Sequence, residues 1–176
     1  MNSKKEILAI ADQKLIDAEL LFQNSRYDNA IYLAGYTVEL YLKAKIAERL
    51  GCDDLFLFNK GSFTKINNAI SFTNQQGKTI PFTLEESENL LGDFLKKLKI
   101  HDLKQLLEYS GLKTDFDMDC SNFIDLKDSW TYVTTNKFKW DESIRYNQTN
   151  VFKQPETNKF IESTKRIKLW IKNYKP

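Results

Sequence analysis

A short polar segment from Arg145 to Asn150 (RYNQTN) holds residue types that could bind a phosphate or a nucleotide. An arginine guanidinium offers a two-pronged donor to a phosphate, and an asparagine amide can hydrogen-bond a base or a ribose. The candidate cluster consists of Glu39, Arg145, Tyr146, Asn147 and Asn150. Glu39 belongs to it because a carboxylate on an apolar helix is costly to bury without a cation. Arg145 is therefore either a phosphate ligand or the structural partner of Glu39, and the sequence leaves both open.

Few other residues are candidates for a catalytic or metal-binding role. One histidine, His101, and two cysteines without CxxC spacing, Cys52 and Cys120, are too few for a His/Cys zinc site. His101 stands at the start of a predicted helix, where we expect a structural role rather than catalysis. The aspartates of TDFDMDC (residues 114–120) alternate as at the opening of a calcium loop, but the glycine and the closing glutamate of that motif are missing. We expect a solvated turn and helix cap there, and no metal ion or cofactor.

The composition is that of a globular, helix-rich protein. Of 176 residues, 41% are hydrophobic and 28% charged, and six Gly and three Pro leave few positions that would break a helix. A chain of this length fits one core, so residues 1–176 are predicted to form a single domain. No apolar run approaches the roughly 18 to 20 residues of a membrane span, and the N-terminus lacks the apolar core of a signal peptide. We expect a cytoplasmic protein with no membrane association.

The net charge of +2 is unevenly distributed. Residues 151–176 hold seven Lys and Arg and two Glu, a local charge of +5, while the first 150 residues carry −3. Such asymmetry can attract phosphates. Alternatively, these cations complement the dipole at a helix C-terminus while their aliphatic stems cover apolar surface.

Apolar residues at helical spacing predict the elements. The expected helices span residues 4–23, 27–50, 83–99, 101–108, 121–135 and 155 to the C-terminal end. Residues 51–82 are rich in Asn, Ser, Thr and Gly and are expected to form a connection with one short helix. The predicted fold is all-α: an antiparallel up-and-down helical bundle of four to five main helices plus short helices, with no sheet of consequence. Small Ala34 and Gly35 on the apolar second helix would let another helix or a second subunit approach closely.

Three segments, in this order, resemble bacterial proteins of the HEPN family. They are YDNAIYLAGYTVELYLKA (residues 27–44), HDLKQLL (101–107) and WDESIRY (140–146). The first of them, which is similar to the central helix of the family, is the most specific. The resemblance implies an antiparallel bundle of four or five main helices that is usually dimeric. It also implies roles in RNA cleavage, in toxin–antitoxin and defence systems, or in partnership with a nucleotidyltransferase.

The sequence departs from the catalytic pattern of that family. Active HEPN ribonucleases carry an Arg followed, after four to six residues, by a His, which can exchange a proton while the Arg stabilises phosphate charge. Counted from Arg145, that histidine would stand at 150, 151 or 152, where the chain has Asn150, Val151 and Phe152. None of these side chains can shuttle a proton. We therefore predict no catalytic residue of that type.

Two classes of function remain open. We favour a non-catalytic module, a homodimer that binds RNA, a nucleotide or a partner protein in a bacterial defence or toxin–antitoxin setting. The alternative is a metal-independent ribonuclease with a divergent active site around Arg145. Because the family packs the WDESIRY segment near the second helix, we also predict that Glu39 holds Arg145. On that prediction, Arg145→Ala would lower the free energy of unfolding by about 3 to 5 kcal/mol.

Overall fold

The computed structural model describes residues 4–51, 62–66, 69–74, 76–83, 101–135, 139–146 and 151–174. Helices dominate these residues, and the predicted all-α helical fold is confirmed. The elements are α1 (Lys4–Gln23), α2 (Tyr27–Leu50), α5 (Leu103–Tyr109), α6 (Lys113–Asn122), α7 (Ile124–Thr134), the 3-10 helix η3 (Glu142–Tyr146) and α8 (Gln154–Asn173). The helix predicted for residues 83–99 lies outside the described residues, except for its first position.

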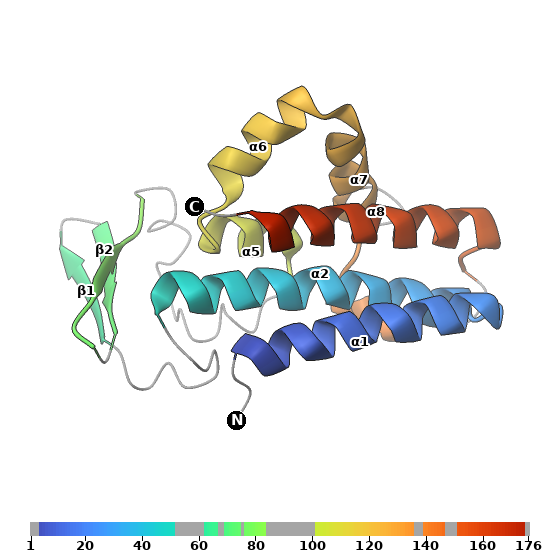
Figure 1. The fold of residues 1–176 in the computed structure, drawn as a ribbon, viewed down its shortest axis with the longest axis horizontal. Coiled ribbons are helices and arrows are strands. Elements are labelled where there is room, and N and C mark those ends of the chain that lie inside the picture. Colours follow the sequence, from blue (N-terminus) through green and yellow to red (C-terminus); the bar gives the residue numbers. More distant parts are fainter. Residues whose placement is uncertain are drawn as a thin grey trace.

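The helix α2 lies at the centre, with α1 antiparallel on one side and α8 on another (Figure 1). One face of α1 buries Ile7, Ala11, Leu15 and Ala18, whose spacing of three or four residues places them on one stripe. In contrast, α2 is buried around most of its circumference because it contacts α1, α5, η3 and α8. It ends where expected, at Gly51, whose left-handed φ of 62° closes the helix.

The helix α8 runs in the same direction as α2. Asp28, at the start of α2, accepts hydrogen bonds from the backbone of Val151 and Phe152 just before α8, and Lys45, near the end of α2, donates to the carbonyl of Tyr174 just after α8. The start of α8 matches the prediction closely. There Pro155 fits the first turn, where its missing N–H is not needed, and Glu156 accepts a hydrogen bond from the backbone N–H before the helix.

The connection after α2 contains strands where one short helix was expected. A three-stranded antiparallel sheet has the order β1 (Ser62–Ile66), β2 (Ala69–Thr73), β3 (Thr79–Pro81). The turn between β2 and β3 is built on Asn74, whose side-chain oxygen accepts from the backbone of Gln76 and Lys78. Because Asn74 is also buried against the end of α2, this turn attaches the sheet to the helical part. The described part of the connection is thus not helical, although the sheet is small.

Two short helices, α6 and α7, form an arch over α8 (Figure 1). The expectation of a solvated turn at residues 114–120 is wrong, because these residues form most of α6. Two local features favour this helix: Asp115 lies in its first turn, where a negative charge complements the dipole, and Lys113 pairs with Asp117 one turn later. Among the described helices, none is both long and apolar enough to cross a membrane.

Candidate functional site

A fully buried carboxylate, Glu39, stands in the middle of α2. One of its oxygens accepts a hydrogen bond of 2.5 Å from the ammonium of Lys43, which lies one turn later on the same helix and is also buried. The other oxygen lies 2.8 Å from Nδ1 of His101. A charge in a protein interior is stable only with such partners, because water is no longer there to solvate it. Both oxygens of Glu39 are therefore engaged.

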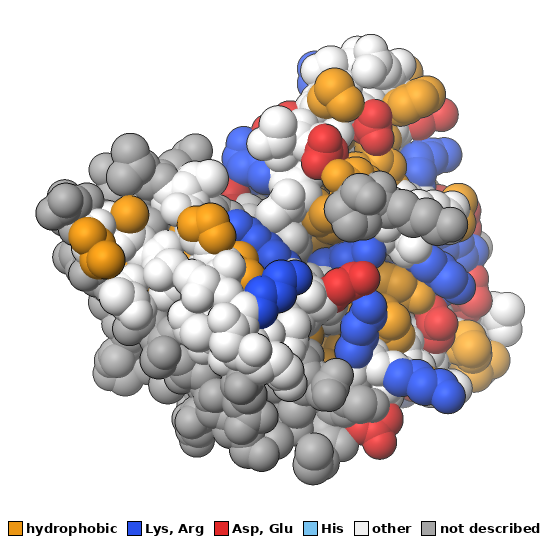
Figure 2. All heavy atoms as spheres, turned by 60° about the vertical axis from the view of Figure 1, so that its left-hand side comes forward, with side chains coloured by type: hydrophobic (Ala, Val, Ile, Leu, Met, Phe, Trp, Pro, Cys, Tyr) orange, Lys and Arg blue, Asp and Glu red, His pale blue; other side chains and the backbone are white. Residues whose placement is uncertain are grey.

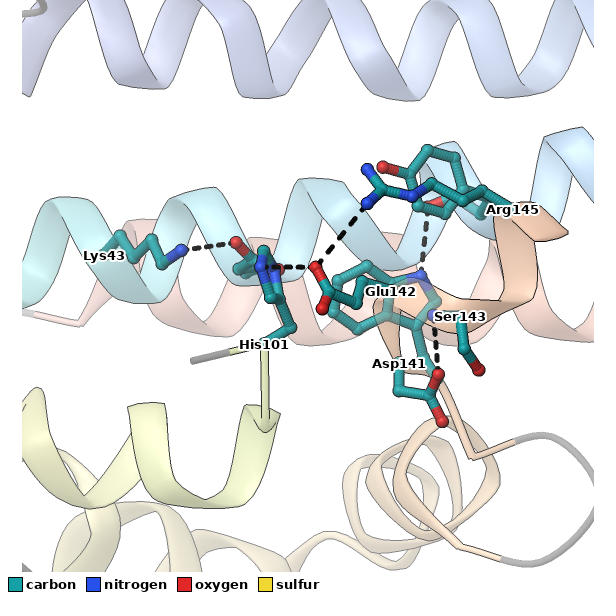
Figure 3. Close-up of polar contacts among 9 residues, drawn as sticks. Lys43, His101, Asp141, Glu142, Ser143 and Arg145 are labelled. Atoms are coloured by element: carbon teal, nitrogen blue, oxygen red, sulfur yellow. Dashed lines mark hydrogen bonds and ion pairs between the residues drawn. The ribbon is translucent and has the colours of Figure 1, made fainter. Parts of the chain in front are cut away.

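The ring of His101 lies between two carboxylates. Its Nδ1 faces Glu39, and its Nε2 is 2.7 Å from Oε2 of Glu142 (Figure 3). A neutral imidazole donates from one nitrogen only, so both contacts are satisfied together by the imidazolium form. The ring position follows from its neighbours in sequence: Asp102 caps α5 by accepting from the backbone N–H groups of Lys104 and Gln105. Because Asp102 is held in this cap, the backbone of the preceding residue, His101, is held in place at the start of α5.

The outer end of this chain of charges is Arg145. Its guanidinium lies 4.0 Å from Oε2 of Glu142 and 4.6 Å from the centre of the Tyr146 ring. Asp141 accepts a hydrogen bond from the backbone N–H of Ser143 and so starts the turn of η3 that carries Glu142 and Arg145. We call Lys43, Glu39, His101, Glu142 and Arg145 the charge chain. Figure 3 shows the contacts that join its labelled members Lys43, His101, Glu142 and Arg145. The charge chain has the buried side chains of Glu39 and Lys43 at one end and the exposed side chain of Arg145 at the other.

The structure corrects the predicted partner of Arg145. The Glu39–Arg145 ion pair expected from the sequence is wrong, because Lys43 and His101 occupy the two oxygens of Glu39. Arg145 is exposed, and it reaches Glu39 only through Glu142 and His101. Of the other predicted site residues, Tyr146 is 76% exposed beside Arg145. Asn147 and Asn150 lie outside the described residues.

The arginine at the surface end of the charge chain is therefore expected to contribute little to stability. Its side chain is exposed, and an exposed ion pair is weakened by solvent screening. We expect Arg145→Ala to leave the melting temperature nearly unchanged, in thermal denaturation followed by circular dichroism. The matched control is Arg49→Ala, since Arg49 is half-buried and donates to the carbonyl of Tyr109. A large loss of stability in Arg145→Ala, equal to that in Arg49→Ala, would contradict the assignment.

An indole ring closes the other side of the site. Trp140 is 2% exposed, and its Nε1 donates a hydrogen bond of 3.0 Å to the carbonyl of Tyr32 on α2. A Cβ built on Gly35 would lie 2.0 Å from this ring, so the glycine provides the space for Trp140. The close approach at Gly35 is thus made by the same chain and not by a second subunit. Burial, with the negative charge of Glu39 as a further cause, raises the pKa of Tyr36 nearby.

A hollow of about 810 Å³ opens beside the charge chain. Its lining includes basic, acidic and hydroxyl side chains: His101, Lys104, Lys139, Glu142, Ser143 and Thr135. Such a mixed lining can hydrogen-bond a polar ligand but has no strong preference for one sign of charge. Within the described ranges, no group of three or more His, Cys, Asp or Glu is arranged to hold a metal ion.

Most of the basic residues of α8 have contacts inside the molecule. Lys165 pairs with Glu19 and Glu162, and Lys168 pairs with Asp12 on α1. These pairs favour the structural interpretation of the C-terminal charge over the phosphate-binding one. On the face that Figure 2 shows, Lys and Arg side chains are interspersed with Asp, Glu and hydrophobic side chains.

Sequence reasoning missed three members of the charge chain: Lys43, His101 and Glu142. A signal for Lys43 was present, since it stands four residues after Glu39 and so on the same side of the helix. His101 was expected to have a structural role at the start of a helix but was not linked to Glu39, and Trp140 was noted only as part of the family resemblance. Their contacts with α2 join residues 62 and 108 positions apart, and no local pattern indicates such pairs.

Comparison with known proteins gives one family. The family model described as "HEPN domain" matches residues 5–52, which form α1 and α2. A search of curated proteins found no match. A search of solved structures found none either. The matched part contains Glu39 and Lys43, the buried end of the charge chain. The family match, which covers α1 and α2, and the helical fold agree with the resemblance to the HEPN family.

Proposed function

We propose that this HEPN protein is a non-catalytic binding module that binds the phosphate groups of RNA or of a nucleotide at the surface end of the charge chain. Binding, rather than cleavage, would then be its role. The ligand would contact Arg145 and Tyr146 in η3 and extend along the adjacent hollow.

One observation carries the non-catalytic part of this proposal: both ring nitrogens of His101 face carboxylate oxygens, at 2.8 and 2.7 Å. The sequence has no other histidine. A general acid or base must be within hydrogen-bond reach of the substrate proton. The nitrogens of His101 contact Glu39 and Glu142 instead, so neither nitrogen is directed at a ribose hydroxyl.

The binding part of the proposal rests on Arg145. Its guanidinium is exposed and lies against the ring of Tyr146, an arrangement that presents a cation beside an aromatic face. A phosphate can accept two hydrogen bonds from such a fork, and a base can stack on an exposed tyrosine. The 4.0 Å separation from Glu142 is that of a loose surface pair, which a phosphate could replace at small cost.

The cellular setting is proposed from the family alone. We expect a cytoplasmic homodimer that acts in a bacterial defence or toxin–antitoxin system, with a nucleotidyltransferase as a candidate partner protein. The close approach at Gly35 no longer supports the dimer, because Trp140 of the same chain fills that space.

RNA binding and RNA cleavage can be measured on the same samples. We expect a fluorescently labelled single-stranded RNA to remain intact after incubation with the protein and to bind in a saturable manner. Arg145→Ala should weaken binding about tenfold, as expected for the loss of a charged hydrogen bond. It should also reduce the slope of log Kd against log salt concentration by about one, since one phosphate contact is lost.

Two controls separate this result from general effects. Arg145→Lys keeps the charge and should retain part of the affinity, whereas Arg166→Ala removes an exposed arginine elsewhere and should leave affinity unchanged. Saturable binding that Arg145→Ala does not weaken would contradict the proposed site.

A second candidate is a ribonuclease that uses Arg145, and one observation favours it. His101 is the only histidine of the sequence, and both His101 and Arg145 contact Oε2 of Glu142. Folding thus places the histidine and the arginine next to the same carboxylate. RNA cleavage that is lost in both Arg145→Ala and His101→Gln would support this candidate and overturn the non-catalytic proposal.

A further inference from the structure

A second hollow, of about 680 Å³, lies where the start of α7 faces the last turns of α8. Four of its lining residues are large and apolar: Phe123, Leu126, Leu169 and Trp170. Phe123 is 60% and Leu169 58% exposed to solvent. The first hollow is lined by the last residues of α7, so the two are at opposite ends of that helix. We call the second hollow the α7–α8 groove.

The helix α6, whose Asp119 lines the groove, buries little of its own surface. The helix α6 buries one residue, Phe116, whose ring meets the rings of Trp130 and Trp170 edge-on at 5.0 and 4.7 Å. The apolar residues Met118 and Ile124, near the α6–α7 junction, are 59% and 64% exposed. Large apolar side chains that gather on a surface mark an interaction site more often than scattered ones do.

The rim of this groove is acidic. Asp119 and Asp125 line it, and Asp119 accepts a hydrogen bond of 2.7 Å from the indole of Trp170. Because that donor is neutral, the negative charge of Asp119 is not cancelled. The same holds for Asp115, which accepts from the hydroxyl of Tyr174. Figure 2 shows hydrophobic and acidic side chains next to one another at the upper end of the molecule, which is the α6–α7 end, with some Lys and Arg side chains among them.

The pKa of the neighbouring Cys120 thiol agrees with a negative electrostatic potential at this end of the molecule. Burial, followed by the charges of Asp117 and Asp119, raises the pKa of Cys120 to about 11. The one cation that lines the groove is Arg166, whose guanidinium donates to the hydroxyl of Ser129. The lining thus has two carboxylates and one arginine. Apolar anchors beside this excess of negative charge favour an occupant with the opposite charge.

We infer that the α7–α8 groove docks an amphipathic helix of a partner protein, with apolar side chains in the groove and Lys or Arg facing Asp119 and Asp125. Helices bind such grooves through apolar residues spaced three or four apart, and flanking charges fix their orientation. RNA does not fit, because its phosphates would meet carboxylates. A second copy does not fit in a two-fold dimer either, since the same acidic rim would then face itself.

The proposal can be tested with the full chain and two peptides of stated composition. The first is an 18-residue (about five-turn) helical peptide of Leu and Lys, with Leu at every third or fourth position and a fluorescein label. The second is the same peptide with each Lys replaced by Glu. Fluorescence anisotropy should show saturable binding of the lysine peptide, and binding of the glutamate peptide at least tenfold weaker.

Substitutions then locate the site. Leu169→Ser should weaken binding of the lysine peptide at least tenfold, and Asp125→Lys about threefold or more. The matched controls are Ile16→Ser, which changes an exposed apolar residue on α1, and Asp128→Lys, which lies on α7 like Asp125 but does not line the groove. Both should bind as the parent protein does. Arg145→Ala should also bind the peptide normally, so that a failure here is distinct from a failure of the proposed function at Arg145.

Each other outcome overturns the proposal. Binding that does not saturate, that is equal for the two peptides, or that survives Leu169→Ser would show that the α7–α8 groove is not the docking site. Sedimentation of the parent protein and of Leu169→Ser provides a further test. If the substitution converts a dimer into a monomer, the groove is an interface between copies of this chain and not a site for a partner helix.

Discussion

Glu39→Gln is expected to lower the free energy of unfolding by about 3 to 5 kcal/mol, the cost of removing one member of a buried ion pair. The substitution keeps the shape of the side chain but leaves the ammonium of Lys43 buried without a negative partner. His101 loses the same carboxylate. For a protein of this size, the melting temperature should fall by roughly 10 °C. Urea denaturation followed by circular dichroism measures the change directly.

The charge chain itself supplies the controls for this result. The loss of stability should decrease from the buried to the exposed end, so that His101→Gln costs less than Glu39→Gln, and Arg145→Ala the least. In a double-mutant cycle, Glu39→Gln combined with Lys43→Met should cost less than the sum of the two single changes, because no lone charge is left buried. Additive effects, or a Glu39→Gln variant as stable as the parent protein, would show that Glu39 is not buried in an ion pair.

Trp140→Ala is expected to destabilise the protein by a similar amount, about 3 to 5 kcal/mol. The indole is 2% exposed, packs against Gly35 and donates a hydrogen bond to the carbonyl of Tyr32. Its removal leaves a cavity between α2 and the segment that leads into η3. The change can be measured by thermal and urea denaturation, and the loss of one of three tryptophans should also reduce the intrinsic fluorescence.

The reciprocal change at Gly35 tests the same contact. In an exposed helix, Gly→Ala would be stabilising by about 1 kcal/mol. Here the new methyl group would overlap the Trp140 ring, so we expect Gly35→Ala to be destabilising by about 1 to 3 kcal/mol. Asn29→Ala, at an exposed position of the same helix, is the control and should have little effect. In a Trp140→Ala background, Gly35→Ala should no longer be destabilising, and a persistent loss would contradict the contact.

The bounds of the longest helices could be predicted because their signals are local. The ranges 4–23 and 27–50 follow from apolar residues at helical spacing and from Gly51, which supplies a left-handed stop. The start of α8 follows from Pro155 and Glu156 in the same way. Each of these signals acts within one or two turns of the helix, so its effect does not depend on the tertiary structure.

The elements between α2 and α8 were harder to predict. The sheet at 62–81 is short and polar, and its periodicity is too weak to distinguish strands from a connection. In α6, the alternating aspartates suggested a turn, but the helix is held by Phe116 among the rings of Trp130 and Trp170. Those rings come from α7 and α8, so the packing that stabilises α6 exists only after the chain has folded.

The sequence by itself determined which residues are present: a single histidine, no histidine at 150–152, and a carboxylate at position 39 that needs a partner if buried. Only the tertiary structure decided what that partner is. Lys43 and Arg145 satisfy the same charge requirement, and charge alone does not choose between them. The choice depends on distance in space, and the caps of α5 and η3 bring His101 and Glu142 into line with Glu39 while Arg145 stays at the surface. An ion pair is specified by geometry across the fold, because electrostatic attraction depends on separation and burial and not on position along the chain.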